Sequence, residues 1–407
     1  MLKLKLHWQI LIAFVIAIIL GITIPEHSGY IRWLGDLFLR ALKMIIVPLV
    51  FSSIVSGVAN LGSTSSLGRL GIKTITYYLT TSVFAILTGL FLVDIIKPGV
   101  GADLGFRMDV PEMTSSTGSL GDIILRMIPT NIFDALASAD MLAIIFFAIM
   151  IGFFIPRVQS EYSDFMIKIF NAVFEVMMKL TSFIIKFAPL GILGIVTGVV
   201  ADQAADKSKL VSMIQHLGIY MVTVLAGLSI HFFITLPLIL KFVGKANPFL
   251  HFRAMSLPII TAFSTSSSSA TLPLTIEAVE NNAGVSNKIS SFVLPLGATI
   301  NMDGTALYEC VAAMFIAQAY GIELGFVQQI IVVVTALLAS IGAAGIPMAG
   351  LVMMSVVLTA VGLPLEGVGL ILAVDRILDM CRTVVNVFSD TCGTVVIAKS
   401  EGETLKV

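Results

Sequence analysis

The chain of 407 residues is 57% hydrophobic and only 12% charged, with a mean hydropathy of +1.02 and a net charge of −1. Soluble proteins are about 25% charged, so this composition excludes a soluble globular protein and indicates an integral membrane protein with several spanning segments. The balanced charge gives no sign of nucleic-acid binding, and the three cysteines lack the spacing of a disulfide framework or a metal site.

Long apolar segments with short polar separators fill the first half of the chain. Residues 8–24 follow two lysines, as in a signal peptide, but no small-x-small cleavage site comes after them, so we expect the first membrane helix here. Residues 98–121 form a polar linker rich in Gly and Ser. If the segments alternate, most Lys and Arg lie on one side, which predicts a cytoplasmic N-terminus. Further helices are expected at about 31–59, 74–96, 131–155, 171–200 and 210–242.

The helix expected at 74–96 begins with a polar cluster made of Tyr77, Tyr78, Thr80, Thr81 and Ser82. Aromatic residues at a helix start are typical of an interfacial belt, and the hydroxyl groups are also able to form a hydrogen-bonding site. The sequence alone favours the belt.

Two stretches in the second half each consist of two short apolar segments, here called arms, on either side of a central tip. The composition of these tips is one that no lipid-facing helix would carry. In residues 258–280 the tip is a run of Ser and Thr, and in residues 327–363 it is rich in Gly, Ala and Pro. Because such arms are too short to span a bilayer, we expect two re-entrant hairpins whose irregular backbone lies inside the protein. A Ser-rich surface loop is the alternative for the first stretch, and its apolar flanks disfavour that alternative.

Between the hairpins, a helix that starts near residue 289 meets the polar sequence NMDGT at residues 301–305. Glycine and clustered polar groups predict a break in the helix, and broken helices are where transporters coordinate cations and substrate. In helical geometry Glu309 shares a face with Asn301 and Thr305, whereas Asp303 points elsewhere. Desolvation at Glu309 favours the protonated carboxyl, so this residue is able to carry a proton.

The last apolar run, residues 367–398, carries a polar face. Its members follow one another at spacings of one, three or four: Asp375, Asp379, Arg382, Thr383, Asn386 and Asp390. On a helix they fall within an arc of about 100°. Ionisable groups within a membrane helix mark an ion or substrate path, although an Asp–Arg pair that only joins helices is the simpler alternative. The order of hairpin, broken helix, hairpin and polar helix predicts a transporter with inverted repeats.

Four motifs carry a family resemblance: SSSSATLP (266–273), NMDGTALYE (301–309), SIGAAGIPMAG (340–350) and DMCRTVVNVFSD (379–390). They resemble the glutamate/aspartate transporters of the dicarboxylate/amino acid:cation symporter family, and the segment order agrees over essentially the whole chain. The resemblance implies a symporter that imports glutamate or aspartate with sodium, protons or both. It implies no cofactor and no enzymatic activity.

The same resemblance implies an all-α polytopic fold with eight transmembrane helices and two re-entrant helical hairpins. The protein would be a homotrimer in the plasma membrane or bacterial inner membrane. Residues 1–70 and 122–206 would form a static scaffold. Residues 71–121 and 207–407 would form a transport domain that slides across the membrane like an elevator.

By resemblance, Arg382 matches the arginine that holds the side-chain carboxylate of the substrate, for which a bidentate guanidinium fork is suited. Asp379 matches the acceptor for the substrate amino group. The implied substrate contacts are Ser268, Thr305, Ile346, Gly350, Asp379, Arg382, Thr383 and Asn386.

Three cation sites are implied in the same way, and their hard oxygen ligands suit an alkali cation. The first comprises Asn386, Asp390 and the carbonyls of Gly297 and Asn301. The second comprises carbonyls of Thr299, Met302, Ser340, Ile341 and Ala343. The third comprises Thr81, Ser82, Asn301 and Asp303, with Tyr78 nearby.

Two departures from the family pattern stand out. Relatives carry an arginine at the position of Ser266 or of Met380, and this chain has neither, so we expect Arg376 to play a similar electrostatic role. Sodium-only members carry glutamine at the position of Glu309, which indicates proton coupling here. Asp375 has no role in the pattern.

Three other functions compete with amino acid symport. A C4-dicarboxylate would also satisfy Arg382, although Asp379 argues for an amino group. An anion channel would need no coupling to an amino acid. An intramembrane enzyme is disfavoured because no histidine falls within the site segments to activate a serine, and because Arg382 favours an ionised Asp379.

Overall fold

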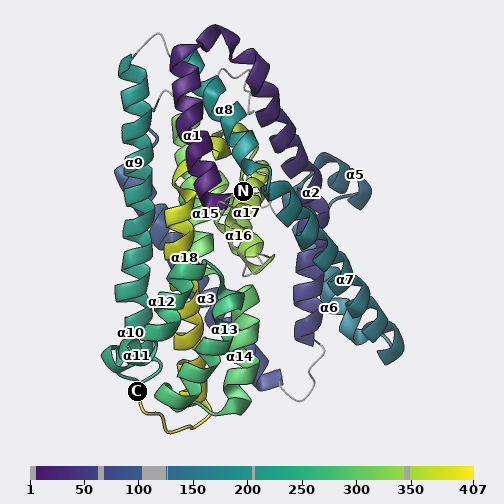
Figure 1. Cartoon of the computed structure of the whole chain (residues 1–407). Coiled ribbons are helices and arrows are strands. Elements are labelled where there is room, and N and C mark those ends of the chain that lie inside the picture. Colours follow the sequence, from purple (N-terminus) through teal and green to yellow (C-terminus); the bar gives the residue numbers. More distant parts are fainter. Residues whose placement is uncertain (1–5, 63–67, 103–124, 126, 204–206, 343–348) are drawn as a thin grey trace, which may run out of the picture.

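The computed structural model describes residues 6–62, 68–102, 125, 127–203, 207–342 and 349–407, and every regular element in these ranges is a helix. Many large apolar side chains on the outside of these helices are exposed, for example Phe91 of α3. Such surfaces are suited to contact with lipid. The chain is therefore organised as a helical membrane protein (Figure 1).

The first group of helices packs around a long second helix (Figure 1). It consists of α1 (Leu6–Thr23), η1 (Pro25–His27), α2 (Gly29–Gly62), α5 (Ile132–Ser138), α6 (Met141–Phe154), η3 (Ile155–Arg157), α7 (Ser160–Ile185) and α8 (Ala188–Gln203). The helix α2 contacts α6, α7 and α8, and α1 packs along α8.

Two expected helices of this group have different boundaries in the structure. The segment expected at 131–155 is two helices, α5 and α6, because Ala139 takes a left-handed conformation with φ 56°. The segment expected at 171–200 begins earlier, with α7, whose charged residues lie on an exposed face. It is bent by 52° where α8 begins, because Pro189 at the second position of α8 cannot continue the hydrogen-bond ladder of α7.

The second group contains all the segments that bear the predicted site. Its first members are α3 (Gly68–Ile96), α9 (Lys207–Ile230), the π-helical turn η4 (His231–Thr235), α10 (Leu236–Phe242) and α11 (Pro248–Ala254). The π turn comes just before Pro237, which cannot donate a backbone hydrogen bond within the helix.

The Ser-rich stretch forms two short helices that pack against each other, α12 (Ser256–Thr265) and α13 (Ser268–Ala278), followed by η5 (Val279–Ala283). Ser266 ends α12 in a left-handed conformation with φ 51°. Ser267 caps α13 by accepting a hydrogen bond from the amide of Ala270 at 3.2 Å. The tip is therefore a tight polar turn between two helices that are each too short to span a bilayer.

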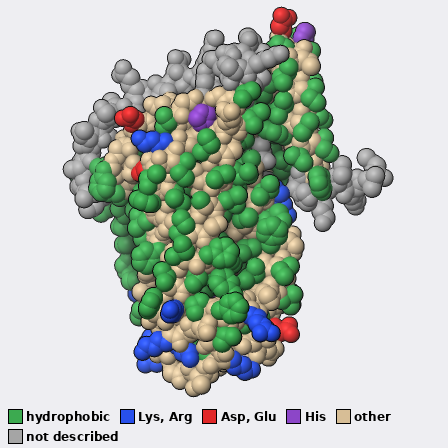
Figure 2. Space-filling view, turned by 90° about the vertical axis from the view of Figure 1, so that its left-hand side faces the viewer, with side chains coloured by type: hydrophobic (Ala, Val, Ile, Leu, Met, Phe, Trp, Pro, Cys, Tyr) green, Lys and Arg blue, Asp and Glu red, His purple; other side chains and the backbone are tan. Residues whose placement is uncertain are grey.

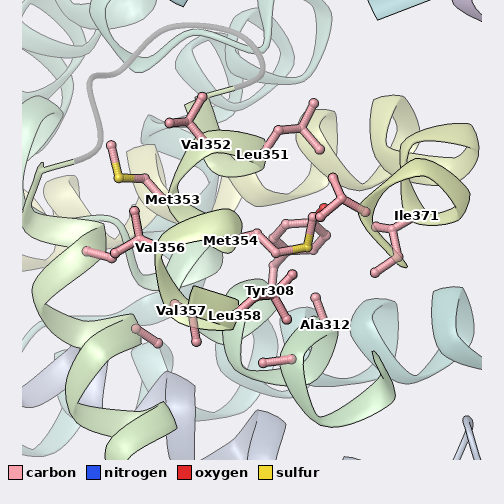
Figure 3. Packing of buried hydrophobic residues seen from close by; sticks show 14 of the residues in the cluster. Tyr308, Ala312, Leu351, Val352, Met353, Met354, Val356, Val357, Leu358 and Ile371 are labelled. Carbon is pink, nitrogen blue, oxygen red and sulfur yellow. The ribbon is translucent and has the colours of Figure 1, made fainter. Parts of the chain in front are cut away.

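The predicted helix break at residues 301–302 is confirmed: α14 (Asn287–Ile300) ends there and α15 (Asp303–Ala319) begins. The second hairpin stretch forms α16 (Phe326–Gly342) and α17 (Ala349–Ala360), which pack against each other and against α15. Its tip, residues 343–348, lies outside the described residues. Figure 3 shows α17 residues 351–358 packed over Tyr308 and Ala312 of α15.

The last helix, α18 (Val368–Ser400), follows η6 (Leu365–Gly367) and contacts α9, α12, α14 and α15. Residues beyond it run back against the start of α3, where Lys73 donates to Glu401 at 2.6 Å. They also reach the segment before α14, where the amide of Lys406 donates to the carbonyl of Ala283 at 2.9 Å.

Three described helices are long and apolar enough to cross a membrane, namely Gly29–Asn60, Arg69–Ile96 and Val211–Phe242, and the bent pair of α7 and α8 makes a fourth if it counts as one span. The helix α18, which carries the polar face, does not meet this criterion for a membrane span.

Candidate functional site

The charged face of α18 is organised around Arg382, whose side chain is only 1% exposed. Its Nη2 atom lies 2.9 Å from Asp379 Oδ1 and 3.1 Å from Asp375 Oδ1. These carboxylates lie one and two turns before Arg382, so the three side chains share a helix face. The guanidinium also stacks 3.8 Å from the ring centre of Tyr308 on α15. Asp375, which had no predicted role, is thus an ion-pair partner of Arg382.

One side of the Arg382 guanidinium is free within the described residues. Its Nε and Nη1 atoms have no hydrogen-bond partner there. A Cβ atom built on Gly350, near the start of α17, would lie 2.6 Å from Nη1, so no larger side chain fits at this position. A buried guanidinium with unused donors requires an acceptor, and a carboxylate matches its fork geometry.

Asn386 joins α18 to the break between α14 and α15. Its Oδ1 accepts a hydrogen bond from the amide of Gly304 at 2.8 Å, and its Nδ2 donates to Thr305 Oγ1 at 3.2 Å. A Cβ atom on Gly304 would lie 2.7 Å from the carbonyl oxygen of Arg382, so glycine permits this close approach. Two predicted substrate contacts, Thr305 and Asn386, therefore lie side by side.

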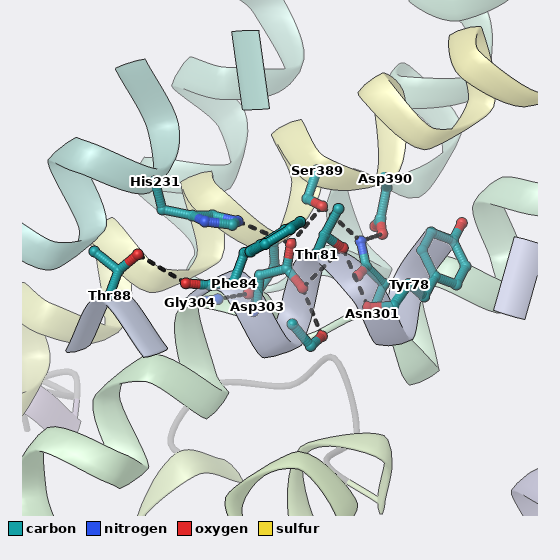
Figure 4. Close-up of polar contacts among 12 residues, drawn as sticks. Tyr78, Thr81, Phe84, Thr88, His231, Asn301, Asp303, Gly304, Ser389 and Asp390 are labelled. Atoms are coloured by element: carbon teal, nitrogen blue, oxygen red, sulfur yellow. Dashed lines mark hydrogen bonds and ion pairs between the residues drawn. The ribbon is translucent and has the colours of Figure 1, made fainter. Parts of the chain in front are cut away.

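Asp303 is fully buried and accepts hydrogen bonds from hydroxyl groups on two helices. Ser82 of α3 donates to its Oδ1 at 2.6 Å, and Ser389 of α18 donates to its Oδ2 at 2.6 Å. Thr81 contributes a longer bond of 3.3 Å, and Nε2 of His231 lies 3.0 Å from Oδ2. Figure 4 shows these groups converging on Asp303. The polar cluster of residues 77–82 therefore lies in the middle of α3 and includes a hydrogen-bonding site, and the sequence preference for an interfacial belt was wrong for Thr81 and Ser82.

The second buried carboxylate, Asp390, lies beside the helix break. Asn301 Nδ2 donates to its Oδ1 at 2.9 Å and to Ser389 at 3.0 Å, while Asn301 Oδ1 has no partner in the described residues. A Cβ atom on Gly297 would lie 2.4 Å from Asp390 Oδ1 and 2.5 Å from the hydroxyl of Tyr78. Carboxylate, amide and carbonyl oxygens therefore crowd together, and such oxygens are the ligands that hard cations prefer.

Glu309 of α15 has no exposed surface, and neither of its carboxyl oxygens has a hydrogen-bond partner in the described part of the chain. Its chain neighbour Tyr308 stacks on Arg382. An ionised carboxylate in such surroundings would be strongly destabilised, so the neutral acid is the form that fits the site.

The other predicted site residues are placed as follows. Thr383 donates within α18 to the carbonyl of Asp379 at 2.8 Å. Ser268 and Ser340 are buried at helix ends that adjoin the two hairpin tips. The side chain of Thr299 is exposed, and Ile341 lies in the last turn of α16, next to the tip. Ile346 and Ala343 lie outside the described residues.

The sequence prediction missed His231, Ser389 and Tyr308. A lone histidine in the apolar run of residues 228–240 was the available signal for His231. No histidine lies within the site segments themselves, but His231 of η4 reaches Asp303 from outside them. The arrangement is still not a catalytic triad, because there a histidine lies between serine and carboxylate, whereas here Asp303 lies between Ser389 and His231.

Buried charges grouped around a broken helix in a membrane protein define a transporter, since such breaks present backbone and side-chain groups to a solute at membrane depth. Comparison with known proteins gives the particular family. Residues 6–400 match the sodium:dicarboxylate symporter family. The chain belongs to this family, and it is accordingly a multi-pass membrane transporter and not an enzyme.

Named relatives align over nearly the whole chain. Excitatory amino acid transporter 3 of Homo sapiens is 38% identical over 99% of this chain and 87% of its own length. The proton/glutamate-aspartate symporter of Escherichia coli is 35% identical, with 98% and 93% coverage. The proton/sodium-glutamate symport protein of Geobacillus stearothermophilus is 36% identical, with 98% and 96% coverage.

Proposed function

We propose that the chain is a secondary active symporter that imports an acidic amino acid, glutamate or aspartate, together with sodium ions, protons or both. The observation that carries this proposal is the buried Arg382, whose Nε and Nη1 atoms have no hydrogen-bond partner in the described residues and whose Nη1 lies close to Gly350. A carboxylate side chain would complete its hydrogen bonding. The names of the relatives, which include glutamate and aspartate transporters, support the same substrate class.

Asp379 is proposed to receive the substrate amino group, while Thr383, Asn386, Thr305 and Ser268 complete the polar contacts. The remaining predicted contacts are Gly350, whose position beside Arg382 supports its role, and Ile346. The partly exposed Arg376 lies 3.7 Å from Asp379 Oδ2, which supports its expected electrostatic role next to the substrate.

Sodium is proposed to bind at the sites built on the two buried carboxylates. Asp390, Asn386, Asn301 and the Gly297 carbonyl would form one site, and Asp303, Thr81, Ser82 and Asn301, with Tyr78 nearby, would form another. The oxygen-rich surroundings of both carboxylates support this assignment. A third site would use the carbonyls of Thr299, Met302, Ser340, Ile341 and Ala343.

We further propose that the two helix groups are a scaffold and a moving transport domain. Residues 1–70 and 122–206 would form the scaffold of a homotrimer. Residues 71–121 and 207–407 would move as an elevator, with eight spans, two re-entrant hairpins and a cytoplasmic N-terminus in the plasma membrane. The packing of α3 on α14, α15, α16 and α18, and of α9 on α15 and α18, supports this division.

A single uptake experiment tests the proposed function. Purified protein in liposomes is expected to accumulate labelled aspartate or glutamate when an inward sodium or proton gradient is imposed, and to accumulate little without one. Uptake of succinate in place of both amino acids would instead identify a C4-dicarboxylate carrier, which the family description favours as the second candidate. Gradient-independent flux of all three would contradict symport.

Proton coupling through Glu309 is a separate prediction. Wild-type protein is expected to take up substrate in response to a pH gradient alone, because the buried carboxyl of Glu309 is able to bind and release a proton. The Glu309→Gln variant keeps the size of the side chain but cannot ionise, and it should lose this response by tenfold or more. Equal and pH-independent uptake by both proteins would contradict the role. Sodium-driven uptake measured in parallel shows whether the variant is folded.

A further inference from the structure

The end of α10 and the segment that joins it to α12 carry Lys and Arg but no Asp or Glu. Lys241, Lys245 and Arg253 lie there with exposed side chains, and none of them makes an ion pair within the described residues. The sequence contains no Asp or Glu between Asp206 and Glu277. These cations therefore have no acidic neighbour within the same stretch of chain, and their joint positive charge attracts anions.

Two aromatic rings lie beside these cations and are also exposed. Phe242, the last residue of the candidate span Val211–Phe242, is 69% exposed, and Phe249 of α11 is 76% exposed. We call the five residues Lys241, Phe242, Lys245, Phe249 and Arg253 the basic aromatic patch. Figure 2 shows Lys and Arg side chains gathered at the lower end of one face, next to the apolar surface of the helices.

We propose that the basic aromatic patch binds the headgroups of anionic phospholipids, with Phe242 and Phe249 inserted at the boundary with the acyl chains. Clustered Lys and Arg at the end of a span attract anionic lipid headgroups, and aromatic rings are enriched at that depth. Arg253 supplies a planar fork for a phosphate, and the two lysines supply point charges.

A bilayer lipid is favoured over a protein partner because the patch continues directly from a membrane-spanning helix, where lipid is already the neighbour. The patch is also fixed to the site-bearing helix. The ring of Phe252 stacks 4.4 Å from that of Phe388, and Nε2 of His251 lies 3.0 Å from Thr391 Oγ1. A lipid bound at α11 is therefore expected to stabilise the packing of α11 on α18.

The test uses the purified full chain in neutral detergent micelles with added phosphatidylglycerol or phosphatidylcholine, and it reads lipid retention by native mass spectrometry together with the melting temperature. Wild-type protein is expected to retain phosphatidylglycerol preferentially and to melt at a higher temperature with it. In the variant Lys241→Gln/Lys245→Gln/Arg253→Gln, the preference for phosphatidylglycerol over phosphatidylcholine should be at least about tenfold weaker than in wild type.

The matched control is Lys168→Gln/Lys179→Gln/Lys186→Gln, which removes three exposed lysines from the α7 region and should behave as wild type. Two further arms separate lipid from soluble anions. Phe242→Ser/Phe249→Ser should weaken retention, and glycerophosphoglycerol, which carries the headgroup without acyl chains, should not raise the melting temperature. The proposal fails if wild type has no preference, if the control loses as much, or if the soluble headgroup acts equally well.

Discussion

The Arg382→Ala variant is expected to lose nearly all affinity for aspartate and glutamate. Truncating one partner of a buried charge pair costs about 2–5 kcal/mol, which corresponds to roughly 30-fold to 4000-fold in the dissociation constant. The guanidinium is buried and has free donors, so water cannot replace the lost contact. Isothermal titration of purified protein with each amino acid measures the effect, and unchanged affinity would remove the basis for the proposed substrate.

Two matched variants separate substrate recognition from general damage. Arg376→Ala removes an arginine from the same helix whose side chain is 30% exposed and 3.7 Å from Asp379, so the expected loss of affinity is at most about fivefold. Arg382→Lys keeps the charge but not the fork, and it should bind more weakly than wild type and more tightly than Arg382→Ala. Melting temperatures of all three are needed, because removing Arg382 leaves Asp375 buried without its ion-pair partner.

Replacement of Asp303 by asparagine is expected to weaken sodium binding strongly. The substitution keeps the shape but removes the charge that holds Ser82, Ser389 and His231, and each hydrogen bond to a charged group contributes about 1.5–3 kcal/mol. Apparent sodium affinity should therefore fall by roughly a hundredfold or more. Aspartate binding measured over a range of sodium concentrations checks this. A sodium dependence equal to that of wild type would contradict the assignment.

Asp94→Asn is the control for this variant. Asp94 is another carboxylate on α3, close to the end of that helix and more than three turns beyond Ser82, and it makes no hydrogen bond with Asp303 in the described residues. Its sodium dependence is expected to match that of wild type. A comparable loss in Asp94→Asn would indicate that any charge removed from α3 disturbs coupling.

The sequence was most informative where one helix or one turn decides the structure. The spacing of Asp379, Arg382 and Asn386 placed them on one face of α18, and the run at 301–305 located the helix break, because both depend on local geometry alone. The Ser-rich tip likewise produced a turn at Ser266.

Contacts between separate helices could not be predicted in this way. The approach of His231 to Asp303 depends on the π turn that precedes Pro237, which rotates the side chain relative to a regular helix. The stacking of Tyr308 on Arg382 depends on which side of α18 is covered by α15, and periodicity does not choose between neighbouring helices. The sequence did not predict the breaks at Ala139 and Pro189, because the segments on both sides of each break are apolar.

The hydrogen bonds of Asp303 also constrain how the chain is made. Ser82 precedes Asp303 by 221 residues and His231 precedes it by 72, but Ser389 is synthesised 86 residues later. At about 5–20 residues per second, this delay is roughly 4–17 s. During that interval the carboxylate enters the membrane with only its earlier partners, so His231 and the hydroxyls of α3 are what shelter Asp303 during biogenesis until α18 arrives.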